Sequence, residues 1–278
     1  MPIKIEAAKI PPHLAKYFQV SLCSSCYICH SLVFLKEIWR VLRKDGVVFW
    51  NIDDSRNGSG GDHKKGGKND AGFQGDLYRG CQPRNAVGLK PKDLCLIPQR
   101  LAIAAQGAGW YVRSQIIWHK QNGMPESVTD RPTDNYEIIL MLTKSGKYYY
   151  DAEAVKQPYV SIPNHDLRDK ASEKYTDTGL FSQGGRDYYS QGGANLRSVW
   201  TFPTASSGYK HYAAFPEELP ERCIKAATKE GDTVLDCFTG TGTTLWVAKR
   251  LNRKAIGFEI SSKYSGYALD RNRQGVIL

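Results

Sequence analysis

The spacing of apolar residues changes along this chain, and each change marks a predicted element. From Leu32 the apolar residues recur every three or four positions, which predicts an amphipathic helix. Asp45 and Gly46 end this helix, and the apolar run over residues 47–52 predicts a buried strand. The same periodicities predict a helix over residues 92–107 and strands over residues 110–120 and 136–142.

Near the carboxyl end, two short apolar runs each end in an acid. The first run ends at Asp236, a glycine-rich turn follows, and residues 244–251 have helical spacing that Asn252 stops. The second run covers residues 254–260 and contains Glu259. Strand, glycine turn, helix and strand form a βαβ unit, whose ligand site lies at the carboxyl ends of the strands. Glu259, about twenty residues past the turn, has the position from which an acid accepts ribose hydroxyls.

Glycines at positions 240 and 242 of this turn let the backbone approach a ligand closely. The turn is not a dinucleotide fingerprint, because Leu245 occupies the third glycine position. A turn that lacks the pyrophosphate loop and keeps an acid on each strand favours a cationic, phosphate-free adenosine cofactor. A purely structural strand-to-helix loop is the alternative.

Residues 236–244 resemble the cofactor motif D-P-F-x-G-x-G-T of S-adenosylmethionine-dependent DNA amino-methyltransferases, with Cys237 in place of the proline. Residues 211–219 resemble the second cofactor element of that family, a Phe-Pro pair followed by glutamate and leucine. The resemblance implies S-adenosylmethionine as cofactor. With the acid of the second run, the cofactor-binding residues are then expected to be Phe215, Pro216, Asp236, Phe238, Gly240, Gly242, Thr243, Thr244 and Glu259.

The resemblance covers residues 32–269 and implies an α/β fold with a doubly wound, mostly parallel sheet and one antiparallel strand. Such a fold is Rossmann-like, and here the catalytic half precedes the cofactor half, a permuted order known in this family. Asp53 and Asp54 follow the strand at 47–52 and either line the site or are solvated loop acids. The predicted division is an irregular segment over 1–31, a catalytic half over 32–156 with a flexible insertion at 56–88, a target-recognition segment over 157–196, and a cofactor half over 197–278.

The family's catalytic loop, a strand followed by Asp/Asn/Ser-Pro-Pro-aromatic, is not found in this sequence. That loop grips the exocyclic amine of a flipped adenine or cytosine. The adjacent prolines Pro11 and Pro12 stand between Ile10 and His13, which offer neither the polar grip nor the stacking ring. The catalytic residues are therefore unknown, and the amino-terminal part is expected to be disguised, diverged or incomplete.

Two functions stay open at this point. The first is a site-specific enzyme that methylates adenine N6 or cytosine N4 in DNA. The second is a diverged, catalytically weak remnant that binds S-adenosylmethionine and DNA. Methylation of RNA or protein is a further alternative, and the resemblance over residues 114–142 argues against it.

A net charge of +10 favours a polyanionic partner, and we expect double-stranded DNA. Lys64, Lys65 and Lys68 lie in a glycine-rich stretch and are available to phosphates, unless this stretch is only a solvated insertion. Seven cysteines form no paired framework, which indicates a reducing compartment. The ligand-like residues at 23, 26, 29 and 30 are too crowded for a tetrahedral metal, so we expect no metal.

The sequence has neither a convincing secretory signal nor an apolar run of about twenty residues, the length that spans a membrane. We therefore expect a cytoplasmic protein without a membrane partner. The oligomeric state, the target base and the recognition sequence stay open.

Overall fold

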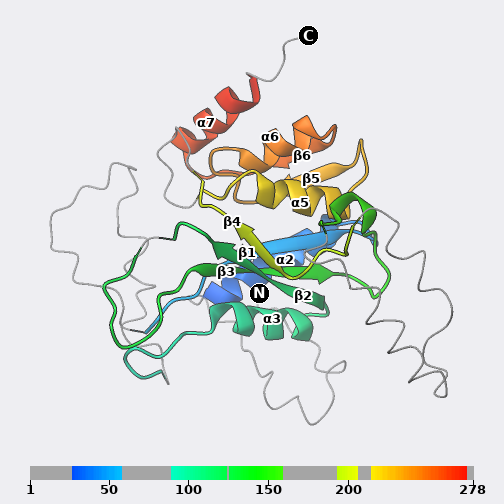
Figure 1. The fold of residues 1–278 in the computed structure, drawn as a ribbon. Coiled ribbons are helices and arrows are strands. Elements are labelled where there is room, and N and C mark those ends of the chain that lie inside the picture. Colours follow the sequence, from blue (N-terminus) through cyan, green and yellow to red (C-terminus); the bar gives the residue numbers. More distant parts are fainter. Residues whose placement is uncertain (1–26, 58–88, 124, 159–192, 206–213, 274–278) are drawn as a thin grey trace, which may run out of the picture. The chain divides into compact units, whose positions relative to one another are not determined.

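The computed structural model describes residues 27–57, 89–123, 125–158, 193–205 and 214–273 (Figure 1). Contacts divide the chain into two compact units, one of residues 1–149 with 198–216 and one of residues 150–197 with 217–278. The predicted cofactor half began at residue 197, whereas these contacts group residues 198–216 with the first unit. Predictions that fall on Pro11, Pro12, Cys23, Cys26 and the three lysines at 64, 65 and 68 lie outside the described residues.

The first unit contains a four-stranded sheet in the order β1-β3-β2-β4. Its strands are β1 (Val47–Ile52), β2 (Tyr111–Lys120), β3 (Tyr136–Thr143) and β4 (Val199–Phe202). Strand β3 pairs antiparallel with both β1 and β2, and β4 pairs parallel with β2. Strands β1, β2 and β4 therefore run in one direction and β3 runs against them, as expected for a sheet with one antiparallel strand.

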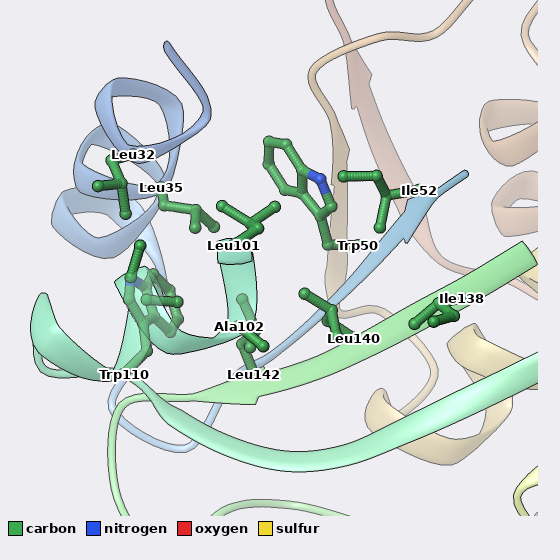
Figure 2. Close-up of a cluster of buried hydrophobic side chains, with 12 residues drawn as sticks. Leu32, Leu35, Trp50, Ile52, Leu101, Ala102, Trp110, Ile138, Leu140 and Leu142 are labelled. Carbon is green, nitrogen blue, oxygen red and sulfur yellow. The ribbon is translucent and has the colours of Figure 1, made fainter. Parts of the chain in front are cut away.

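Helices α2 (Tyr27–Val41) and α3 (Ile97–Gly107) pack on this sheet through one apolar core. Figure 2 shows the side chains of β1 and β3 pointing toward the two helices. The Trp39 and Trp110 rings meet edge to face with centroids 4.9 Å apart. The buried members of the core come from all four elements and their flanks: Leu32, Leu35, Trp50, Ile52, Leu101, Ala102, Ala104, Ala105, Trp110, Ile138, Leu140 and Leu142.

Both helices differ from what the apolar spacing predicted. Helix α2 is already helical at Tyr27, the first described residue, so residues 27–31 of the segment predicted to be irregular are helical. Helix α3 starts at Ile97, and the predicted helix at residues 92–96 is wrong. Lys92 has φ 71° and Leu96 has φ 55°, and this left-handed backbone interrupts any helix between them. Pro98 then lies in the first turn of α3, where its missing N–H costs nothing.

Strand β2 contains a bulge at Arg113. Val112 pairs with Leu142 and Ser114 pairs with Met141, so Arg113 has no opposite residue in the register with β3. Val112 packs against the core under the helices, whereas the buried residues after the bulge are Ile116 and Trp118. Because of the extra residue, the even-numbered side chains of β2 point toward the helices before the bulge and to the opposite face of the sheet after it.

The second unit contains the parallel pair β5 (Thr233–Asp236) and β6 (Lys254–Gly257) with helices α5 (Glu218–Ala227), α6 (Thr243–Arg250) and α7 (Ser262–Arg273) and the short helix η3 (Glu153–Val155). Its apolar core consists of Ile224, Val247 and Ala248, with Val234, Trp246 and Leu251 packed against it. Asn252 has φ 58° directly after Leu251, the residue that caps α6, which confirms it as the predicted helix stop. Strand β6 ends at Gly257 rather than continuing to residue 260.

Two features that would change the functional picture are not found in the part of the chain that the structure describes. No described helix combines the length and the apolarity needed to cross a membrane. No group of at least three His, Cys, Asp or Glu residues within the described ranges has the arrangement of a metal site. Two of the four residues that were not expected to bind a metal are described: Cys29 is buried on α2, and the next residue, His30, is exposed.

Candidate cofactor site

The glycine turn between β5 and α6 has a left-handed backbone at both of its glycines. Gly240 has φ 55° and Gly242 has φ 82°, both in the left-handed region that glycine adopts without a steric cost. A Cβ atom at Gly242 would lie 2.9 Å from the Ala268 Cβ of α7, so this position also lacks space for a side chain. At Gly257, at the end of β6, a Cβ would lie 2.2 Å from the Thr239 Oγ1 of the turn. The turn is thus enclosed by α7 and β6.

Glu259 holds the turn to the end of β6. The Gly240 N–H donates to Glu259 Oε2 at 2.8 Å, and the Ser261 N–H donates to Glu259 Oε1 at 2.8 Å. A carboxylate offers about four acceptor sites, so both oxygens keep capacity for a ligand hydroxyl. The spacing in the sequence predicted Glu259 as a ligand-binding acid and missed that it also shapes the turn.

Asp236 has a similar second role at the start of the turn. Its Oδ1 accepts the Phe238 N–H at 2.9 Å, and its backbone oxygen accepts the Thr239 hydroxyl at 3.2 Å. Burial, followed by the charge of Asp236, raises the pKa of the Cys237 thiol, so this cysteine is a neutral thiol at physiological pH. The residue that replaces the family's proline therefore adds no charge to the turn.

Threonines line the inside of the turn and aromatic rings lie outside it. Thr239, Thr241 and Thr243 are all buried, although the motif pointed only to Thr243 among them. Thr244 is half-buried at the start of α6. The Phe238 and Phe258 side chains are 57% and 59% exposed, which makes them an apolar rim on the two strand ends. Phe258 was missed, although an apolar residue directly before the acid Glu259 was visible in the sequence.

Phe215 and Pro216 belong to the first compact unit, whereas the other predicted cofactor residues belong to the second. Phe215 is half-buried and Pro216 is buried. The next residue, Glu217, precedes the first residue of α5 and belongs to the second unit. The predicted role of the Phe-Pro pair stays a prediction.

A charged cluster lies at the carboxyl ends of β1 and β2 in the first unit. Lys120 Nζ lies 2.7 Å from Glu137 Oε1 and 3.6 Å from Asp53 Oδ2. The Asn51 amide donates to the other oxygen of Glu137 at 2.6 Å. Asp53 keeps 59% of its side chain exposed, but neighbouring protein atoms partly desolvate its carboxylate, which raises its pKa and outweighs its attraction to Lys120. Burial lowers the pKa of Lys120, but the hydrogen bond and charge of Glu137 and the charge of Asp53 outweigh this, and the pKa is raised overall.

The two acids after β1 have different roles that the sequence left open. Asp54 Oδ1 accepts the N–H of Ile97 at 3.0 Å, so Asp54 satisfies a donor at the start of α3. Asp53 instead faces Lys120. Lys120, Glu137 and Asn51 were not predicted as site residues, because strands distant in the sequence bring them together.

Ion pairs hold the segment that links β2 to β3. Arg131 lies 2.8 Å from Glu126, and its neighbour Asp134 lies 2.7 Å from Arg56. Asp130 pairs with Lys92 at 2.6 Å. The hydrogen bond from Lys92 lowers the pKa of Asp130. This segment lies within residues 114–142, which resemble the methyltransferases, and its charges attach it to Arg56 after β1 and to Lys92 before α3.

A family model described as DNA methylase matches residues 23–270, which is most of the chain. The chain belongs to this DNA methylase family. It is 40% identical over 256 residues to the Type II methyltransferase M.Cfr9I of Citrobacter freundii, covering 91% of this chain and 74% of that one. It is 36% identical over 245 residues to the Type II methyltransferase M.SmaI of Serratia marcescens, covering 88% of this chain and 73% of that one.

Solved structures share the fold of this methylase. The cytosine-N4-specific PvuII DNA methyltransferase has a TM-score of 0.57 at 18% identity, covering 88% of this chain and 70% of that chain. A structure from Thermus thermophilus, complexed with S-adenosyl-L-methionine and described as a candidate DNA modification methylase, has a TM-score of 0.50 at 22% identity, covering 89% and 79%. These two structures confirm the predicted α/β methyltransferase fold. The family model and the Type II relatives confirm the prediction of a DNA amino-methyltransferase that depends on S-adenosylmethionine.

Proposed function

We propose that this methylase transfers the methyl group of S-adenosylmethionine to the exocyclic amine of adenine (N6) or cytosine (N4) in double-stranded DNA. The observation that carries the proposal is the turn at residues 236–244, closed by Glu259 and enclosed by α7 and β6. The cofactor, when bound, supplies a methyl group on a sulfonium. The chain's own residues bind and orient it.

The proposed cofactor residues are those that the sequence indicated. Glu259 accepts the ribose hydroxyls through lone pairs that its two backbone contacts leave available. Asp236 adds negative charge at the end of β5, which favours a cationic ligand. Residues 240 and 242 bring backbone close to the ligand, and Phe238 covers it. Phe215, Pro216, Thr243 and Thr244 complete the set.

Calorimetry with S-adenosylmethionine tests the cofactor site. We expect Glu259→Ala to weaken binding by about 1.5–3 kcal/mol, the range of a charge-assisted hydrogen bond. Glu230→Ala removes a carboxylate from an exposed residue of the same unit and should keep the parent affinity. Unchanged affinity in both Asp236→Ala and Glu259→Ala would contradict the assignment.

The net charge of +10 supports a largely electrostatic contact with DNA. The logarithm of affinity should fall linearly with the logarithm of salt concentration. Replacing Lys64, Lys65 and Lys68 with alanine should reduce that slope by about one phosphate contact for each lysine that touches the backbone. A triple variant with the parent slope would place these lysines away from the DNA.

The Type II relatives support a role in restriction-modification, with the cytoplasm as the proposed location. Digestion of labelled DNA to nucleosides, followed by mass spectrometry, distinguishes N6-methyladenine from N4-methylcytosine. Either product supports the proposed reaction, and a product methylated on carbon contradicts it.

A catalytically weak remnant is the second candidate, and the residues around Pro11 and Pro12 favour it. Orienting the amine contributes a term of several kcal/mol, so a chain without the gripping loop should lose orders of magnitude in rate. Ile10 and His13 stand where the family places the grip and the ring. For this candidate, tritium transfer from S-adenosylmethionine to DNA is weak or absent although the cofactor binds. Robust transfer that is lost in Pro11→Ala/Pro12→Ala would reject the remnant and indicate a catalytic loop in an altered form.

A further inference from the structure

One arginine of the last described helix contacts two places that matter for the proposed cofactor site. Arg271 Nη1 donates to Thr243 Oγ1 at 3.0 Å, and Arg271 Nη2 donates to Glu217 Oε1 at 2.6 Å. The Arg271 side chain is 18% exposed, so water screens these contacts less than it screens a surface pair. Thr243 is buried and directly follows Gly242, the left-handed glycine of the turn.

Helix α7 packs directly on the turn around this contact. The space beside Gly242 is filled by Ala268, whose Cβ would lie 2.9 Å from an added Cβ, and by Asn272, whose Nδ2 would lie 3.1 Å from it. Lys249 Nζ of α6 donates to the Asn272 backbone oxygen at 2.8 Å. The end of α7 is therefore attached to both ends of α6, and Arg271 makes its contact at the end that carries the turn.

Arg250 provides an internal comparison. It donates to Glu217 Oε2 at 2.6 Å and to Glu221 Oε2 at 2.6 Å, so both arginines share the carboxylate of Glu217. Arg250 lies at the end of α6 opposite the turn. Loss of either arginine removes ion pairs with Glu217, but only Arg271 has a hydrogen bond to the turn residue Thr243.

We propose that Arg271 is a positioning residue for the cofactor turn. By holding the Thr243 hydroxyl, it fixes the conformation of residues 240–243 in which their backbone meets the cofactor. Through Glu217 it also holds the residue that directly follows Phe215 and Pro216 in the sequence, the second proposed cofactor element. A planar guanidinium with fixed donors suits two acceptors at once, and an ammonium does not replace it. This inference rests on the proposed cofactor site.

The test compares Arg271→Met, Arg271→Lys, Arg250→Met and Asp236→Ala in the full chain. Calorimetry gives the Kd for S-adenosylmethionine, and steady-state rates on DNA give its KM and kcat. Arg271→Met should raise Kd and KM about tenfold, with kcat at saturating cofactor unchanged, because a hydrogen bond to a charged group is lost from the site. Arg271→Lys should fall between parent and Arg271→Met. Arg250→Met should keep Kd within about twofold while its melting temperature falls as much as that of Arg271→Met.

Each outcome separates this inference from the cofactor assignment. If Asp236→Ala loses binding and Arg271→Met keeps the parent Kd, the role of Arg271 is rejected and the cofactor site stands. Equal increases of Kd in Arg271→Met and Arg250→Met would indicate general loosening and also reject it. Parent affinity in both Asp236→Ala and Arg271→Met would reject the cofactor site itself.

A variant of the acceptor keeps the inference testable if Arg271→Met does not fold. Thr243→Val removes the hydroxyl and leaves the Arg271–Glu217 pair intact. It should raise Kd by at least the same factor, since Thr243 is also a proposed cofactor residue. Adding it to Arg271→Lys should give less than the product of the two single effects, because the two residues share one contact. Independent, multiplicative effects would overturn the proposal.

Discussion

Strand β3 buries every side chain from Ile138 to Thr143, whereas every residue of strand β6 is exposed. The first unit therefore stabilises its sheet with apolar packing, in which Leu35, Leu101, Leu140 and Leu142 are completely buried. The second unit has a small apolar core and is held by polar contacts around the glycine turn. The proposed cofactor residues lie mainly in this second unit, where exposed strand ends leave backbone and acids accessible to a ligand.

This difference predicts whether a substitution should mainly change stability or ligand affinity. The free energy gained from apolar burial is proportional to the area removed from water, and truncating one core side chain removes a large part of it. Polar contacts contribute less each, but they fix the conformation of a turn that glycines make flexible. Stability should therefore be most sensitive in the first unit and ligand affinity most sensitive in the second.

Leu101→Ala should give the largest loss of stability. Leu101 is fully buried between α3 and the sheet, so its truncation should lower the free energy of unfolding by about 2–5 kcal/mol. Ile103→Ala on the same helix is the matched control, since Ile103 is 46% exposed, and its effect should be below about 1 kcal/mol. Urea unfolding monitored by tryptophan fluorescence measures both. Equal losses would contradict the view that packing dominates this unit.

Gly242→Ala should disturb the second unit more than Gly231→Ala, although the two glycines have nearly the same φ angle. Their φ angles are 82° and 81°, and an alanine at either position costs about 1–2 kcal/mol. Only Gly242 also faces Ala268, so crowding should add about 1–3 kcal/mol there. Thermal unfolding of both variants tests this. Equal destabilisation would mean that α7 moves away freely and does not brace the turn.

Two acids, one in each unit, should give opposite dependences on pH. The folded pKa of Asp53 is raised by partial desolvation, so its contribution to stability, which solvent keeps small because the side chain is 59% exposed, is present below pH 3.8 and is lost as the pH rises through the folded pKa. The folded pKa of Glu221 is lowered by its hydrogen bond with Lys225, so its contribution is present above pH 4.5 and is lost as the pH falls through the folded pKa.

The stability of Asp53→Asn relative to the parent should therefore be greater at pH 7 than at pH 3. The stability of Glu221→Gln relative to the parent should be smaller at pH 7 than at pH 3. Denaturant unfolding at both pH values gives the two differences. The same sign for both variants would show that partial desolvation of Asp53 does not cost stability at neutral pH.

Ile256→Thr should have the smallest effect. Ile256 is 50% exposed on β6, and substitutions at such surfaces change stability by about 0.5 kcal/mol or less. Ile139→Thr on β3 is the comparison, because Ile139 is fully buried and the substitution places a hydroxyl in apolar surroundings, away from water. A loss at Ile256 as large as that at Ile139 would show that the exposed face of β6 is covered in solution.

The sequence predicted the elements whose pattern is local. The runs at 47–52 and 136–142 predicted strands because most of their positions are apolar and each run contains β-branched and aromatic residues. The glycine turn was predicted because its residues carry the backbone conformation themselves. The start of α3 was not, because the left-handed conformations of Lys92 and Leu96 are set by contacts of a loop and not by residue type.

The sequence pattern did not predict the site residues whose partners are distant in the chain. Arg271 reaches Thr243 across helices, and Lys120 reaches Glu137 across strands, so neither contact has a spacing that a motif records. Asp53 and Asp54 are adjacent and chemically identical, and only the start of α3 distinguishes the one that supports a helix from the one that faces Lys120.

The bulge at Arg113 has a consequence for insertions and deletions in related chains. Removing one residue from a regular strand turns every later side chain to the opposite face, which would exchange Ile116 and Trp118 with their exposed neighbours. Removing Arg113 itself leaves the pairs Val112 with Leu142 and Ser114 with Met141 in their present order. Position 113 is thus where homologues of different length can gain or lose a residue in β2 without rebuilding the sheet, and alignments of this strand should place their gap there.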